Sequence, residues 1–219
     1  APALEPHLGS PEAMVERVAA AVEALWAPGR VVGVLGGEHT LTVGGVRALR
    51  RRYPDLSVLY LDAHADLRDS YLGARYGHAT AARRVAELCP LVLAGVRALS
   101  QEEAAFARQR GLPLYLRLPG GAPLDPEAVA AHLTRHVYLS VDLDVLDPAL
   151  MPAVGTPEPG GLGWEEVLGL VRAVAASRRL VGFDVVELAP QQGPPACSYV
   201  AAKLVYKVVA YATLIGKGE

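Results

Sequence analysis

Six side chains in three short segments of this sequence could bind divalent metal ions. The two clustered segments space them two residues apart, and the full set is His39, Asp62, His64, Asp66, Asp142 and Asp144. In extended backbone, side chains two residues apart lie on the same face. Each clustered segment could therefore present its ligands to a single point.

The donor types indicate what kind of metal would bind. Aspartate and histidine without cysteine favour manganese, iron, cobalt or zinc in a reactive centre over a structural zinc site. Two such ions about 3.5–4 Å apart can share carboxylates and hold a water whose pKa falls toward neutrality. Four aspartates carry the charge that two divalent ions would cancel, whereas without ions these carboxylates would repel one another. We therefore expect two cations.

Each segment alone has an ordinary explanation. Acids in loops are often only solvated, aspartate also caps turns, and Gly36-Gly37 is a turn signal. The metal interpretation depends on their shared position. Residues 31–35, 57–61 and 137–141 are apolar runs, and each run directly precedes one of the three segments.

The elements needed to position these residues follow from the hydrophobic pattern. Apolar runs predict strands at 31–35, 57–61, 91–96, 112–116, 137–141 and 180–186. Helical periodicity and capping signals predict helices at 11–25, 40–52, 79–88, from 100 onward, 125–135, 164–177 and 199–215. Strands that alternate with helices and are apolar throughout predict an α/β fold, a three-layer sandwich with a mostly parallel central sheet. In such folds ligands bind beyond the carboxyl ends of the strands, where all three segments fall.

Composition excludes several classes of function. The chain has 219 residues, 52% of them hydrophobic, and a net charge of −2, so no global field recruits nucleic acid or a membrane surface. Cys89 and Cys197 have no CxxC partner and are expected to be buried thiols in a reducing compartment. No signal peptide or membrane-length apolar run is present, so we expect a cytoplasmic protein.

Five segments together resemble the ureohydrolase (arginase–agmatinase) family, most closely its agmatinase branch. Residues 36–40 (Gly-Gly-Glu-His-Thr), 62–66 (Asp-Ala-His-Ala-Asp) and 140–148 are similar to its three signatures. Residues 155–162 and 182–190 are similar to further agmatinase segments. The resemblance runs from about Val31 to the C-terminus and implies an arginase-like single domain over residues 1–219. The N-terminal strand usual in the family is apparently missing.

The resemblance implies a two-manganese site and a hydrolase of linear amidines. By matched position, His39, Asp62, Asp66 and Asp142 would hold one ion, and Asp62, His64, Asp142 and Asp144 the other. Asp62 and Asp142 would bridge. The water between the ions would attack a guanidinium carbon, and urea and an amine would leave.

Two further residues take roles from the same match. Glu187 aligns with the guanidinium-binding acid, and a carboxylate suits a planar guanidinium because the pair can be bidentate. His78 aligns with the proton-shuttling histidine, since imidazole titrates near neutrality and can protonate the departing amine. We therefore assign catalysis to His78, Glu187 and Asp66, and substrate binding to Glu187 and His78. A solvated acid and a surface histidine are the ordinary alternatives.

The substrate expected is agmatine or aminopropylagmatine, in polyamine synthesis. The loop at 67–76 lacks the asparagines with which arginases grip the amino acid end of arginine, and Arg68 is unexpected close to a cationic substrate. Arginase, guanidinobutyrase and formiminoglutamase activities stay open, as do a non-catalytic family member and a two-metal phosphohydrolase on another scaffold. Family resemblance also suggests a homo-oligomer, a trimer or hexamer.

Overall fold

The computed structural model describes residues 1–215, in which strands and helices alternate along the chain. The strands are β1 (Val32–Leu35), β2 (Ser57–Leu61), β3 (Leu91–Val96), β4 (Leu114–Leu116), β5 (His136–Asp142) and β6 (Arg179–Val186). The helices are α1 (Pro11–Leu25), α2 (Leu41–Arg50), α3 (Ala81–Ala86), α4 (Gln101–Arg110), α5 (Pro126–Ala131), α6 (Trp164–Ser177) and α7 (Ala196–Leu214). The expected domain end at residue 219 lies outside the described residues.

The six strands form one sheet in the order β1-β6-β5-β2-β3-β4, and every neighbouring pair is parallel. This confirms the predicted sheet. The apolar runs explain it, because a strand covered on both faces has no polar side; all five residues of β2 are buried.

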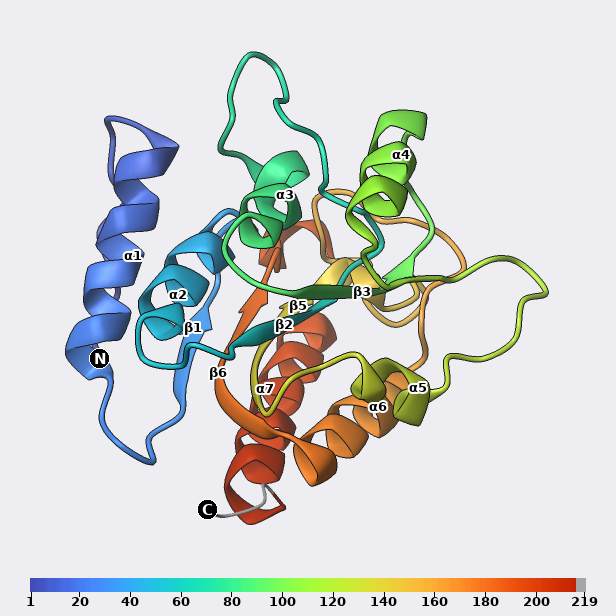
Figure 1. The fold of residues 1–219 in the computed structure, drawn as a ribbon. Coiled ribbons are helices and arrows are strands. Elements are labelled where there is room, and N and C mark those ends of the chain that lie inside the picture. The colour runs from blue at the N-terminus through green and yellow to red at the C-terminus, as the bar shows by residue number, and fades with distance from the viewer. Residues whose placement is uncertain (216–219) are drawn as a thin grey trace.

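Helices cover both faces of the sheet and make three layers (Figure 1). Residues of α1, α2 and α3 share one hydrophobic core with one face, and residues of α5, α6 and α7 share a second core with the other. No helix within residues 1–215 combines the length and apolarity needed to cross a membrane.

Most helix boundaries follow from local signals. Ser10 Oγ accepts a hydrogen bond from the Ala13 N–H at 3.2 Å, with Pro11 at the first helical position. Several predicted boundaries differ from the structure by one or two residues, and two were wrong by three or more. Helix α5 ends at Ala131 rather than 135, because the N–H and hydroxyl of Thr134 bind the Ser57 hydroxyl at 3.0 and 2.8 Å and lead the chain into β5. Helix α7 begins at Ala196 rather than 199, directly after Pro195, which adopts helical backbone angles that suit a first turn.

The strand register brings the predicted segments to one edge. Leu35 pairs with Val185, Val185 with Val141, and Val141 with Leu61, so these residues form one row across β1, β6, β5 and β2. The chain beyond this row carries His39, Glu187, the Asp142 segment and the Asp62 segment. Four neighbouring strands therefore deliver the candidate site residues to one edge.

Candidate metal centre

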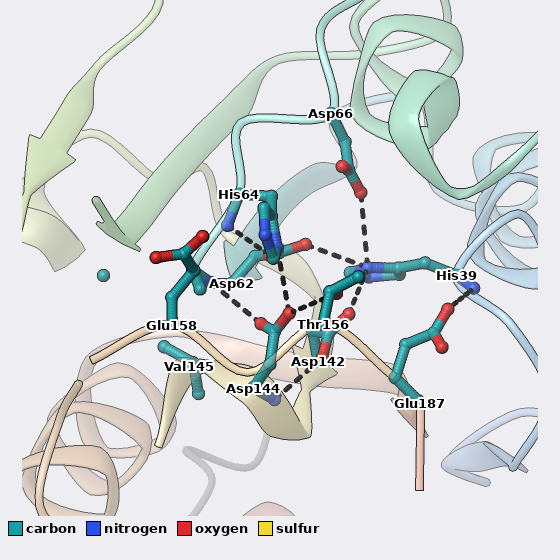
Figure 2. Close-up of polar contacts among 12 residues, drawn as sticks. His39, Asp62, His64, Asp66, Asp142, Asp144, Val145, Thr156, Glu158 and Glu187 are labelled. Atoms are coloured by element: carbon teal, nitrogen blue, oxygen red, sulfur yellow. Dashed lines mark hydrogen bonds and ion pairs between the residues drawn. The ribbon is translucent and has the colours of Figure 1, made fainter. Parts of the chain in front are cut away.

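The first group of donors surrounds the imidazole of His39 (Figure 2). Its Nδ1 lies 3.0 Å from Asp62 Oδ2, 3.2 Å from Asp142 Oδ2 and 3.6 Å from Asp66 Oδ2. His39, Asp62 and Asp142 are buried, and their donor atoms are close enough together to share one ion.

The second group is centred on His64. Its Nδ1 lies 2.9 Å from Asp144 Oδ2 and 3.4 Å from Asp62 Oδ1. These three residues again place one donor atom each within the range of a shared ion. Asp62 belongs to both groups and turns one oxygen toward each, which is the arrangement that a bridging carboxylate requires.

Backbone N–H groups hold the carboxylates in place. Asp142 Oδ1 accepts from the Asp144 N–H at 2.8 Å, and Asp144 Oδ1 accepts from the Ala63 N–H at 3.0 Å. The second of these bonds joins the segment after β2 to the turn after β5. This hydrogen bond therefore fixes the Asp62 segment and the Asp142 segment relative to each other.

Two site residues adopt left-handed backbone conformations. Asp66 has φ of 51° and Glu187 has φ of 65°, and Leu72 is the third non-glycine residue with positive φ in residues 1–215. Such conformations cost about 1–3 kcal/mol each and persist where surrounding structure imposes them. At this edge of the sheet, the surrounding structure therefore fixes the direction of these two side chains at a cost in backbone conformational energy.

A layer of polar side chains lies behind the donors, and the sequence analysis missed it. His39 Nε2 lies 2.8 Å from Ser140 Oγ, which donates to the buried Asp184 at 2.7 Å. The ring of Tyr60 stacks on that of His39 with centroids 4.2 Å apart, and its hydroxyl donates to Asp66 Oδ2 at 2.8 Å. Ser140 and Asp184 interrupt apolar strand runs, which was the available signal.

The pKa values show that the donors are mutually dependent. Burial lowers the pKa of His64. Hydrogen bonds with Asp144 and Asp62 have the opposite and larger effect, and the pKa rises to about 11. Burial and the charge of Asp62 raise the pKa of Asp142 and of Asp144 above the usual range. Burial also raises the pKa of Asp62, yet the nearby imidazoles of His39 and His64 leave it below its usual range.

The residues fit a pair of divalent cations. His39 Nδ1 and Asp62 Oδ2 are buried without a hydrogen-bond partner, although they lie close together. Unpaired buried polar atoms are costly unless something else binds them. A cation between them would satisfy both, and the carboxylate and imidazole donors suit manganese, iron, cobalt or zinc.

Glu187 and His78, assigned by resemblance, lie at different depths. Glu187 follows β6 directly, and its Oε1 accepts from the His39 N–H at 2.7 Å, which places it beside the first group. Burial raises the pKa of Glu187. His78 is exposed at the end of the loop after β2, with its ring edge against Tyr71 at 5.6 Å between centroids. The guanidinium of Arg68, whose presence was unexpected, lies 5.6 Å from the same Tyr71 ring.

Comparison with known proteins agrees with this geometry. The sequence profile of the arginase family matches residues 2–210. The chain is 39% identical over 204 residues to an N(1)-aminopropylagmatine ureohydrolase of Synechocystis sp., covering 91% of this chain and 67% of that protein. It is 41% identical over 188 residues to a Thermus thermophilus protein of the same name, covering 83% of this chain and 62% of that one.

A solved structure, the agmatine ureohydrolase of Thermoplasma volcanium, superposes with a TM-score of 0.82 at 34% identity, covering 95% of this chain and 71% of that chain. The chain thus spans about two thirds of the length of the curated relatives it matches. The family profile covers well over half of the chain, and the two named relatives are 39% and 41% identical to it. The chain belongs to the arginase family.

Proposed function

We propose that this protein hydrolyses a guanidino compound, agmatine or N(1)-aminopropylagmatine, to urea and an amine with two Mn²⁺ ions. The observation that carries the proposal is the position of Glu187. This half-buried carboxylate lies next to the first of two groups of candidate metal donors that share Asp62. The names of the relatives support the same chemistry. We assign this chemistry to polyamine synthesis.

We assign the donors as the sequence suggested. His39, Asp62, Asp66 and Asp142 would hold one ion, and Asp62, His64, Asp142 and Asp144 the other. When bound, two such ions supply Lewis acidity and a water nucleophile near neutral pH. The protein holds the donors in advance, since the backbone bonds to Asp142 and Asp144 do not depend on metal.

Glu187 would bind and orient the guanidinium. Carboxylate and guanidinium pair through two parallel hydrogen bonds, which fix the plane of the substrate and present its central carbon to the centre. The N–H of His39 holds one oxygen of Glu187. The same peptide unit that carries a metal donor therefore positions the substrate acid.

His78 would transfer the proton that the departing amine needs. Its exposed position suits exchange of protons with solvent, and Tyr71 supports one edge of its ring. Asp66, the third residue assigned to catalysis, is held by the Tyr60 hydroxyl at 2.8 Å. We also propose a cytoplasmic homo-oligomer, a trimer or hexamer.

The test is urea release with Mn²⁺ from agmatine, aminopropylagmatine, arginine and guanidinobutyrate, together with formamide release from formiminoglutamate. We expect the first two to be hydrolysed fastest. Release only from a substrate with a carboxylate tail would assign Arg68 to that tail and overturn the proposed substrates. Fewer than two ions per chain together with neither urea nor formamide from these compounds would indicate a non-catalytic family member.

A further inference from the structure

Arg97 follows β3 directly and has an unusual set of partners. Its guanidinium donates only to backbone carbonyls among its hydrogen bonds in residues 1–215. The acceptors are the carbonyls of Gly95, Asp144, Val145, Leu146, Glu158 and Pro159. An arginine that binds this many carbonyls holds segments together, because each carbonyl belongs to the main chain.

The shortest of these bonds join two loops. Arg97 Nη2 donates to the carbonyls of Asp144 and Glu158, at 2.7 Å each. Asp144 is a donor of the His64 group, and Glu158 lies in the loop at 155–161. Thr156 in that loop has its hydroxyl 3.5 Å from Asp144 Oδ2. The guanidinium thus fixes the Asp144 turn and the loop that covers it.

The backbone of the same residue reaches the other ligand segment. The N–H of Arg97 donates to the Ala63 carbonyl at 2.8 Å, between Asp62 and His64 in the sequence. Nearby, Gly95 allows close packing against Val145 in the turn that carries Asp144. A Cβ built at Gly95 would lie 2.5 Å from Val145 Cγ2, and its φ of +94° is also unfavourable for other residues. Arg97 therefore contacts the segments on both sides of the His64–Asp144 pair.

The guanidinium also carries charge that its carbonyl partners do not neutralise. It lies close enough to Asp144, Glu158, Asp147 and Asp62 for their charges to act on it. A fixed cation at this position offsets part of the repulsion among the buried carboxylates. Lysine could supply the charge but not the planar fork of five donors.

We infer that Arg97 is a positioning residue for the half of the metal centre built on His64 and Asp144. It holds the Asp144 carbonyl, the covering loop and the Ala63 peptide in one arrangement. The His39 group comes from β1, β2 and β5 and has no hydrogen bond to Arg97. The inference rests on the proposed two-ion centre, and it assigns the loss on removing Arg97 to one ion of the pair.

The test is Mn²⁺ binding to purified Arg97→Met and Arg97→Lys, measured by calorimetric titration and by electron paramagnetic resonance. We expect Arg97→Met to keep one ion at wild-type affinity and to bind the second at least about tenfold more weakly. When Arg97→Met holds one ion per chain, its spectrum should be that of an isolated manganese ion and not that of the coupled pair expected in the wild type. The affinity of Arg97→Lys for the second ion should lie between those of the wild type and Arg97→Met.

Arg117→Met is the matched control. Arg117 lines the same cavity as Arg97 but pairs with the Glu166 carboxylate at 3.0 Å, away from the donors. It should bind both ions as the wild type does. If Arg97→Met binds both ions normally, or loses both equally, the inference is wrong.

Two further outcomes are separable. If circular dichroism shows that Arg97→Met is unfolded, Arg97→Lys decides: a weakened second ion supports the inference, and normal binding of both overturns it. A wild-type protein that binds fewer than two ions refutes the proposed centre itself, whatever the variants do.

Discussion

The hydroxyl of Ser140 lies 2.8 Å from Nε2 of His39 and donates its proton to Asp184 Oδ1 at 2.7 Å. A serine hydroxyl has one proton, so toward His39 it acts as an acceptor. His39 must then carry a proton on Nε2, which leaves its Nδ1 free to bind a cation. The fully buried Asp184 therefore sets the tautomer of a metal donor through one intervening hydroxyl.

Replacing Ser140 with alanine should weaken Mn²⁺ binding by about tenfold, because the tautomer of His39 is no longer fixed. The free energy of unfolding of the metal-free protein should fall by about 1–3 kcal/mol, since Asp184 loses its partner. Titration calorimetry and denaturant unfolding measure the two effects. Ser57→Ala is the control: Ser57 is also buried on a neighbouring strand, but its partner is Thr134, so it should lose stability with unchanged affinity. Normal affinity in Ser140→Ala would contradict the relay.

Removing metal should lower the melting temperature. An ion present at 100 times its dissociation constant stabilises the folded state by about 2.7 kcal/mol, which is about 5–10 °C for a domain of this size. Scanning calorimetry with Mn²⁺ and with a chelator measures the difference. In Asp62→Asn the difference should vanish, because Asp62 serves both groups of donors. If the chelator does not change the melting temperature of the wild type, metal binding does not stabilise the fold.

Glu187→Gln should keep both ions and lose substrate binding. A charged hydrogen-bonded pair contributes about 1.5–3 kcal/mol, so kcat/KM should fall about 10- to 100-fold. Urea-release kinetics and metal analysis of the same sample separate the two properties. The exposed Glu102, at the start of α4, provides the control substitution Glu102→Gln, which should change neither. Wild-type kinetics in Glu187→Gln would remove this residue from the substrate site.

Cys89 should resist thiol reagents in the folded protein. Burial raises the pKa of its thiol to about 12, and only the thiolate reacts. Cys197 is buried as well. Titration with a disulfide reagent should label neither cysteine under native conditions and both in denaturant. Rapid native labelling of Cys89 would show that the segment after α3 opens readily.

The strands and the meeting of the candidate donors were predictable because both leave local signals. Apolar runs without alternation indicate strands covered on both faces, and a parallel sheet brings their carboxyl ends together. His39, Asp62 and Asp142 therefore meet as expected. The sharing of Asp62 between two groups followed from resemblance, and the structure supplies the two oxygen positions that make it plausible.

The supporting residues were not predictable from the sequence in the same way. Apart from Gly95, the residues whose carbonyls the Arg97 guanidinium binds lie 47 to 62 residues away, and a carbonyl acceptor leaves no trace in the sequence. Tyr60 reads as one more apolar strand residue, although its hydroxyl holds Asp66. The surrounding fold imposes the left-handed backbone at Glu187. The residue is neither glycine nor asparagine, so its type does not predict this conformation.

The left-handed backbone at Asp66 and Glu187 lowers the stability of the fold while it places two side chains in the candidate site. Glycine would relax both positions, and a screen that rewards only heat resistance would favour it there, as strained active sites generally allow. The winners of such a screen would lack Asp66, a proposed metal donor, and Glu187, the proposed substrate acid. Engineering this protein for hot conditions should therefore leave the backbone of these two residues unchanged and add stabilising substitutions at the far end of the sheet.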